Sequence, residues 1–218
     1  MKKDAYLNNQ NIHNFLLTPP GMSFSRLGYP VIEGVEEVPE NMETISFNYV
    51  PSTKEYDKWV HFYIQDYLFE RVWYNPTKYL EMLKNFEGVI GPDFSLFRDM
   101  PYPLQMFNKY RIQWLSRYWQ LNGVKVVPNV TWSDKNSYEW CFDGIPKHSV
   151  VSISAIGCMQ ENMSRKLFYE GYEKALEVLE PKLVLLRCAD KYRDELVTMT
   201  GPTQLLTYDQ FSRYERAK

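Results

Sequence analysis

The sequence has little of what marks a secreted, membrane-spanning or disulfide-bonded protein. Its three cysteines, Cys141, Cys158 and Cys188, are too few and too scattered for a disulfide framework, and they favour a reducing compartment. No run of about 18 apolar residues offers a membrane span. The basic start at Lys2 is not followed by the apolar segment of a signal peptide. We therefore expect a cytoplasmic protein.

Familiar catalytic motifs are missing as well. The chain contains no Walker phosphate loop, no GxGxxG, no HExxH, no CxxC and no GxSxG. Its three histidines, His13, His61 and His148, lie far apart and lack the spacing of metal ligands. We therefore predict neither a metal site nor a cofactor.

The composition is that of an ordinary globular protein with many aromatic rings. Of 218 residues, 44% are hydrophobic, 24% are charged and 16% are aromatic. The net charge of -2 gives the surface no general attraction to nucleic acid or anionic lipid. The rings can fill a large core or line a pocket.

Short apolar runs alternate with amphipathic segments from Ile45 onward. This repeat of strand and helix predicts right-handed crossovers and a mostly parallel sheet of six or seven strands. We favour a complete or partial TIM-like barrel over an open doubly wound sheet, because no glycine-rich turn follows the first strand. The predicted strands are Ile45–Tyr49, Trp59–Ile64, Gly88–Ile90, Val124–Val127, Val150–Ser154, Leu183–Arg187 and Gln204–Tyr208.

Helix start and stop signals separate these strands. Asn75 and Pro76 open a helix over 77–86, and a long helix over 104–121 ends at Asn122-Gly123. A third helix begins near Asn162 or Ser164 and ends before a proline, and a short one follows Asp190.

Residues 1–40 differ from the rest of the chain because they are irregular and contain several prolines and glycines. We interpret them as an extended N-terminal arm attached to the domain by Leu16, Leu17, Phe24 and Leu27. Residues 41–218 are predicted to form a single α/β domain.

Polar side chains follow the predicted strands at the edge where ligands of parallel α/β folds bind. We predict Asp93 as general acid/base or nucleophile, with Asp66 or Glu70 tuning it, because neighbouring carboxyls push their pKa values apart. The residues predicted to bind substrate are Ser95, Asn129, Trp132, Ser154 and Arg187.

Each of these residues also has a structural interpretation. In this interpretation Asp93 caps the next turn and Asp66 is a loop residue or a helix N-cap. Trp132 plugs the end of the barrel, and Arg187 pairs with Asp66 or Asp93. Glu70 is interpreted first as half of a loop-locking ion pair with its neighbour Arg71, and second as a third carboxylate of the site.

The predicted helix 104–121 interleaves basic and aromatic residues, among them Lys109, Arg111, Trp114 and Arg117. Such a pattern occurs in proteins that bind single-stranded nucleic acid. It is more typical of a helix with one core face and one solvated charged face.

Several sequence blocks together carry a family resemblance: HFY at 61–63, FERVW at 69–73, PDFSL at 92–96, VPNVTW at 127–132 and FDGIP at 142–146. Over roughly residues 40–190 the chain resembles an uncharacterised domain-of-unknown-function family of Gram-positive bacteria, their phages and mobile elements. The resemblance implies a phage or mobile-element setting but no reaction. The chain departs from the family at Arg187, where a small residue is usual.

Two functions are consistent with these observations. The first is an enzyme that acts on a nucleoside- or sugar-like ligand, by glycosyl transfer or hydrolysis, at the carboxyl ends of the strands. The second is a non-catalytic protein of a mobile element that binds nucleic acid or a host protein.

Overall fold

The structure is a computed structural model, and it describes residues 13–207. Its strands are β1 (Thr44–Ser46), β2 (Trp59–His61), β3 (Gly88–Ile90), β4 (Val126–Val127), β5 (Val150–Ser154), β6 (Leu183–Arg187) and β7 (Gln204–Thr207). Its α-helices are α2 (Arg71–Tyr74), α3 (Pro76–Leu83), α4 (Tyr102–Leu121), α5 (Tyr138–Cys141), α6 (Asn162–Leu179) and α7 (Asp190–Thr200). The 3₁₀ helices are η1 (Phe15–Leu17), η2 (Phe47–Tyr49), η3 (Asp66–Leu68) and η4 (Lys135–Ser137).

All paired strands run parallel, as predicted, but they form two sheets. One has the order β1-β2-β3-β4 and the other β5-β6-β7. A single parallel bridge between Asn129 and Ser152 joins them, through bonds of 2.9 Å from Val130 N–H to Ser152 O and 2.8 Å from Ser152 N–H to Pro128 O. The bond of this ladder that would precede Asn129 needs an N–H on Pro128, which proline lacks, and the N–H of Val150 donates instead to Val35 O. The ladder therefore does not extend to the residues before Asn129.

The prediction of a TIM-like barrel built on one sheet of six or seven strands is wrong. A barrel closes only when its first and last strands exchange hydrogen bonds, and within residues 13–207 β1 and β7 are the edge strands of separate sheets. The strands are also short, from two residues in β4 to five in β5 and β6. What forms instead is a pair of small parallel sheets joined edge to edge.

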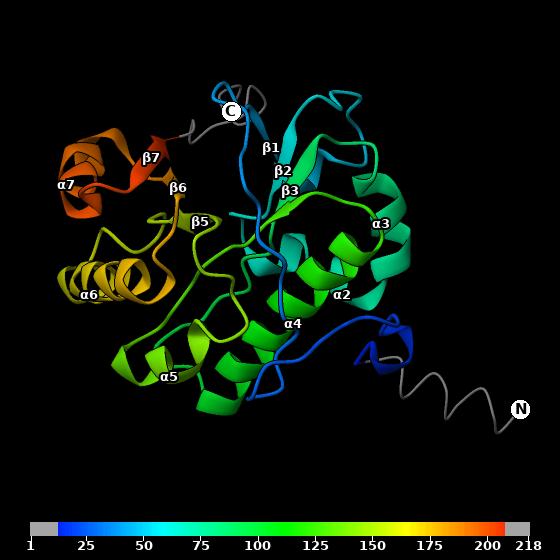
Figure 1. Cartoon of the computed structure of the whole chain (residues 1–218), viewed down its shortest axis with the longest axis horizontal. Helices are drawn as coiled ribbons and strands as arrows, with labels where there is room; N and C mark the ends of the chain where they lie inside the picture. Colours follow the sequence, from blue (N-terminus) through cyan, green and yellow to red (C-terminus); the bar gives the residue numbers. More distant parts are fainter. Residues whose placement is uncertain (1–12, 208–218) are drawn as a thin grey trace, which may run out of the picture.

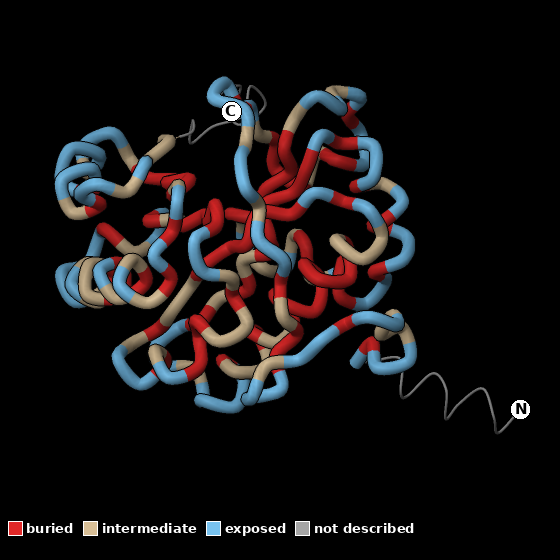
Figure 2. Tube along the Cα trace, in the orientation of Figure 1, coloured by how far each residue is buried: buried red, intermediate tan, exposed pale blue. Residues whose placement is uncertain are grey.

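Alternating side chains of the strands divide the core into separate clusters. Val60 and Val89 pack with α2, α3 and α4, whereas Val151 and Val184 pack with α5, α6 and α7. The opposite faces of both sheets form a third cluster that includes Trp59, Ile90, Val127, Val150 and Leu185. Figure 1 shows the helices grouped beside their own sheets, and Figure 2 shows the buried chain running through the middle of the molecule.

Helix α4 crosses the molecule as a core element. Trp114 and Trp119 are fully buried, and Lys109, Arg111 and Arg117 are at most 8% exposed. The interpretation of this helix as a nucleic-acid surface is therefore wrong, because its basic and aromatic side chains face the protein interior. The expected core face is confirmed, but the expected solvated charged face is not, because these three basic side chains are buried.

Of the four predicted anchors of the segment before β1, Leu17 packs against the core. Leu16, Phe24 and Leu27 are at least 40% exposed, whereas Tyr29 and Ile32, which were not predicted, are buried. The backbone N–H of Ile32 donates to Gly144 O at 3.0 Å, and Val150 N–H donates to Val35 O at 2.9 Å. This segment therefore crosses both halves of the molecule, while residues 1–12 of the predicted arm lie outside the described residues.

Replacing Gly88 by Ala should destabilise the protein. Gly88 pairs with Trp59 across the β2–β3 ladder, and a Cβ at Gly88 would overlap the Trp59 ring. Overpacking of this kind costs about 1–3 kcal/mol. We expect urea unfolding of Gly88→Ala to show this loss.

Trp59→Leu provides the control for that substitution. Alone it should destabilise the protein by opening a cavity, but combined with Gly88→Ala it removes the overlap. Strictly additive losses in the double variant would contradict the ring–glycine contact.

Candidate functional site

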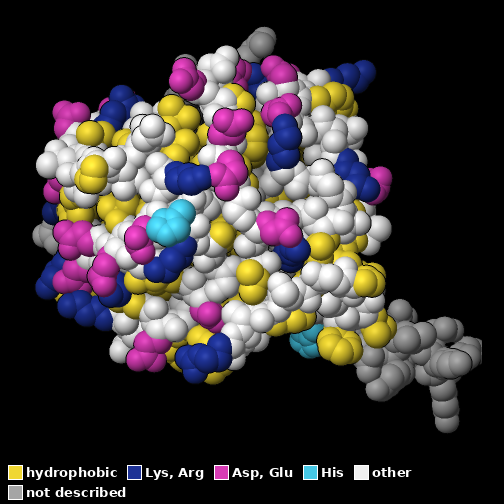
Figure 3. All heavy atoms as spheres, viewed as in Figure 1, with side chains coloured by type: hydrophobic (Ala, Val, Ile, Leu, Met, Phe, Trp, Pro, Cys, Tyr) yellow, Lys and Arg dark blue, Asp and Glu magenta, His cyan; other side chains and the backbone are white. Residues whose placement is uncertain are grey.

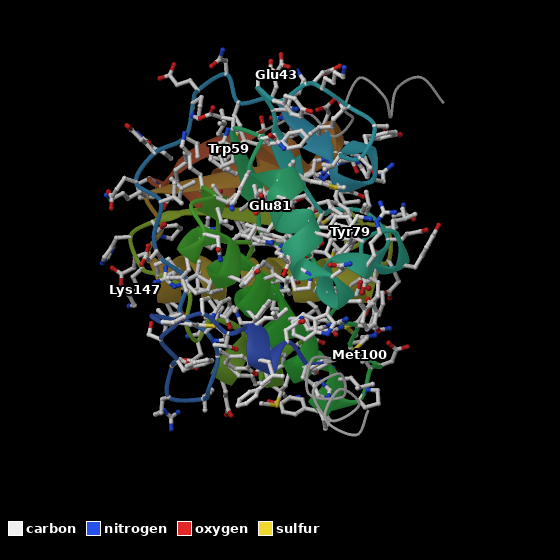
Figure 4. All side chains as sticks on the ribbon, turned by 90° about the vertical axis from the view of Figure 1, so that its right-hand side faces the viewer. Glu43, Trp59, Tyr79, Glu81, Met100 and Lys147 are labelled. Atoms are coloured by element: carbon white, nitrogen blue, oxygen red, sulfur yellow. The ribbon has the colours of Figure 1, made fainter. Side chains whose placement is uncertain are left out.

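The loops that follow β3, β4 and β5 converge on a pocket of about 340 Å³, which the first turns of α6 complete. The carboxyl ends of β3, β4 and β5 point towards this pocket. Figure 4 shows this direction: Glu43, just before β1, lies at one end of the molecule, and Met100, in the loop after β3, lies at the other. A volume in this range suits a small organic ligand.

Four of the predicted site residues line this pocket: Asp93, Ser95, Trp132 and Ser154. Asn129 and Asp66 are bound directly to two of them, and so form the layer behind the wall. Glu70 and Arg187 are not part of the lining. The roles of these residues remain a prediction, and the structure adds the cavity that four of them line.

Asp93 is held by Asn129 on one side. The amide of Asn129 donates to Asp93 Oδ1 at 2.8 Å and to Pro92 O at 3.0 Å, and its Oδ1 accepts from the Tyr63 hydroxyl at 2.9 Å. All hydrogen-bonding groups of this buried amide are therefore used inside the protein. Asn129 orients Asp93 and does not reach a ligand.

The pKa of Asp93 is raised to about 6, chiefly because burial removes water from its carboxylate. The hydrogen bond from Asn129 opposes this shift, the negative charge of Asp66 adds to it, and the positive charge of Arg187 again opposes it. A carboxyl with a pKa near 6 exchanges protons readily at neutral pH, as a general acid/base requires.

Asp66 fastens the β3 loop instead of entering the pocket. Its Oδ1 accepts from the Ser95 hydroxyl at 2.9 Å and its Oδ2 from the Ser95 backbone N–H at 3.1 Å. The two predicted carboxylates therefore have different positions. Asp93 lines the cavity, and Asp66 acts on Asp93 through its charge and through its bonds to Ser95.

Glu70 locks the same loop from the other side. It forms a salt bridge with Arg111 of α4, whose guanidinium also lies 3.8 Å from the centre of the Phe94 ring. The predicted loop-locking role fits this contact, but the partner is Arg111; Arg71 lies instead over Phe47. Phe94 stands between Asp93 and Ser95, so this contact fixes both.

Arg187 ends β6 in the interior. Its Nη1 lies 2.7 Å from Nε2 and 3.0 Å from Nδ1 of His61, and the Tyr63 backbone N–H donates to His61 Nδ1 at 3.3 Å. Burial, and then the charge of Arg187, lower the pKa of His61 well below its usual value. The ring is therefore neutral, and Arg187 is a buried charge beside the site.

Trp132 is a fixed wall of the pocket. Its indole N–H donates to Leu167 O at 3.2 Å, and its ring packs against Phe168 and over Gly171. Trp132 therefore packs against α6 and lines the cavity, and its role in binding a substrate stays a prediction.

Three further hydroxyl residues line the pocket: Thr131, Ser133 and Ser164. The first two lie in the loop after β4, where the strand-end rule places rim residues, but they were not among the residues predicted to bind substrate. Ser164 lies on α6, which that rule does not cover. Cys158 also lines the pocket, but burial and then the charge of Asp93 raise its pKa to about 11, so it is a thiol and not an activated nucleophile.

Metal ligation and membrane insertion are two further features on which the described residues bear. Among residues 13–207, no group of three or more His, Cys, Asp or Glu side chains is assembled as metal ligands. In the same part of the chain, every helix is too short or too polar to span a bilayer.

Comparisons with known proteins agree on a family. A family model described as "Domain of unknown function (DUF4417)" matches residues 22–209. The Gene 1 protein of Mycobacterium phage D29 is 31% identical over 203 residues, which cover 89% of this chain and 73% of that protein. The Gene 1 protein of Mycobacterium phage L5 is 36% identical over 126 residues, which cover 58% of this chain and 55% of that protein. No solved structure matches.

Replacing Asp93 by Asn should stabilise the protein in a pH-dependent way. A carboxyl pKa raised from 3.8 to about 6 means that the folded state prefers the protonated acid, so the native protein loses stability as pH rises through this interval. Two pKa units correspond to roughly 3 kcal/mol. The difference in unfolding free energy, variant minus native, should grow by up to that amount between about pH 4 and pH 7 in urea titrations.

Asp57→Asn controls for the loss of one negative charge, because Asp57 is exposed on the loop before β2. If the difference in unfolding free energy between Asp93→Asn and the native protein changes no more with pH than that of this control, the buried environment assigned to Asp93 is incorrect.

Proposed function

This chain belongs to the DUF4417 family, and we propose that it is an enzyme that acts on a nucleoside- or sugar-like ligand in the pocket at the carboxyl ends of β3, β4 and β5. The observation that carries the proposal is Asp93: it lines the pocket, is oriented by Asn129, and has a pKa of about 6. A group with these properties can both donate and accept a proton at neutral pH.

The proposed roles follow from the contacts. Asp93 moves the proton, and Asn129 holds it at the required angle. Ser154 and Ser95 supply hydroxyl groups to the ligand, and Trp132 supplies a flat apolar wall. Arg187 moderates the pKa of Asp93.

Glycosyl transfer or hydrolysis is the proposed reaction class. Such reactions need a carboxyl that can protonate a leaving group, and the pKa of Asp93 suits that step. The phage relatives support a setting in a phage or other mobile element, and we propose a Gram-positive host for it.

Non-catalytic binding is the second candidate, and one observation favours it. Three apolar side chains at or beside the mouth of the pocket, Phe97, Ile156 and Met163, are between 45% and 60% exposed. They suit an apolar partner surface better than nucleic acid. On the face seen in Figure 3, positive and negative side chains are interspersed, without a continuous basic stripe.

Small molecules that copurify with the native protein test the proposed function. We expect mass spectrometry to find a ligand in preparations of the native chain and a strongly reduced amount in Asp93→Asn, because the variant cannot exchange the proton and, with its amide oxygen bound to Asn129, presents an N–H₂ group where the native residue has an acceptor oxygen. Asp57→Asn should retain the ligand.

Two negative results together would count against an enzyme site at Asp93: no ligand copurifies with the native chain, and no nucleoside or sugar of a panel raises its melting temperature. A ligand retained in equal amount by Asp93→Asn would remove Asp93 from the site.

A further inference from the structure

The hydroxyl of Ser133 lies in the wall of the pocket without a partner. Ser133 is 8% exposed and lines the cavity, and within the described chain its Oγ makes no hydrogen bond. Its backbone N–H is satisfied, since it donates to Ser137 Oγ at 3.1 Å. The oxygen has almost no accessible surface, so it meets a group in the cavity only when the side chain rotates towards it. Buried hydroxyls are rarely left unpaired, and a ligand in the cavity would supply the missing partner.

Asp66 determines what Ser95 can offer to such a group. Ser95 gives its hydroxyl proton to Asp66, so towards a ligand its Oγ can only accept. Asp93, two residues earlier, accepts from Asn129 at Oδ1, and no hydrogen bond from residues 13–207 reaches its Oδ2. One loop therefore presents two hydrogen-bond acceptors to the pocket.

The charges around the pocket disfavour an anionic group at this end of a ligand. The ionisable acidic and basic residues in the lining are Asp93, Arg98 and Asp99, with a net charge of -1 when all are ionised. The N-terminus of α6 is not free for an anion, because the carboxylate of Glu161 already accepts from the backbone N–H groups of its first turn. A neutral or cationic edge that carries N–H donors suits this environment.

The apolar walls of the cavity indicate the shape of the ligand. Trp132 and Phe168 give the cavity flat aromatic sides, and Leu96 adds an apolar one. Such walls suit a planar ring. The polar groups are concentrated on the loops after β3 and β4.

We propose that the pocket recognises a guanidine edge, that is, two adjacent N–H donors on a planar group, as in a guanine base or an open guanidinium. The two donors meet Asp93 Oδ2 and Ser95 Oγ, and the Ser133 hydroxyl meets another polar atom of the ligand. This inference rests on the proposed ligand site and names its substrate class. The flat walls favour guanine in a nucleoside.

Calorimetric titration of the full chain with four probes tests the proposal: guanosine, inosine, adenosine and arginine. Inosine lacks the 2-amino group of guanosine, so it should bind about tenfold more weakly, the effect of one lost hydrogen bond. Adenosine presents an acceptor at N1 and should bind more weakly still. Arginine binding more tightly than guanosine would support the same edge chemistry in an open guanidinium. Inosine or adenosine binding as tightly as guanosine would overturn the proposal.

Serine variants assign the contacts. Ser95→Ala and Ser133→Ala should each weaken the binding of the preferred probe about tenfold, whereas Ser95→Thr keeps the hydroxyl and should restore it. Ser52→Ala is the matched control, because that exposed serine bonds only to Tyr49 O at 3.1 Å. Thermal unfolding of each variant confirms that it is folded. Equal affinity of all four variants would contradict the assignment.

The two proposals fail in different ways. A copurifying ligand that depends on Asp93 but has no guanidine edge overturns this inference and supports the ligand site. The absence of both a copurifying ligand and any binding by the probes overturns both.

Discussion

Asn129 is the residue on which the rest of the site depends. Its backbone forms the single bridge that joins the two sheets, and its side chain holds the carboxyl of Asp93 at 2.8 Å. Pro128 ends the ladder on the side before Asn129, because it has no N–H to donate. One position therefore both aligns the two halves of the fold and orients the titratable group at their boundary. The pocket lies at this boundary because β3, β4 and β5 end there.

The loop after β3 shows how buried polar groups prepare the pocket. Asp66 accepts from the hydroxyl and the backbone N–H of Ser95, and Glu70 pairs with Arg111, which covers Phe94. These contacts satisfy charges that would be costly to bury alone, and they hold residues 93–95 in place before any ligand binds. Preorganisation of this kind keeps a carboxyl desolvated in the free protein, and desolvation is the main cause of its raised pKa.

Much of the fold can be predicted from sequence because its signals are local. Continuous apolar runs gave β3, β5 and β6 with the observed bounds, and Asn122-Gly123 marked the end of α4. Closure of a barrel is a long-range property, and periodicity carries no information on it. The strand-end rule found Asp93, Ser95 and Ser154, but it placed Asn129 and Asp66 at the ligand, because it does not tell which polar side chains are used by their neighbours. The partner of Glu70 lies 41 residues away, so no spacing rule reveals it.

The central claim is that the pocket surrounds a desolvated carboxyl prepared for proton exchange. A site-specific measurement of the carboxyl ¹³C chemical shift of Asp93 against pH tests it most directly. The balance of burial, Asn129, Asp66 and Arg187 predicts a midpoint near 6. Removing the amide with Asn129→Ala should move the midpoint higher, since the Asn129 hydrogen bond favours the ionised form. A midpoint near 4 in the native protein, unchanged in the variant, would contradict the account.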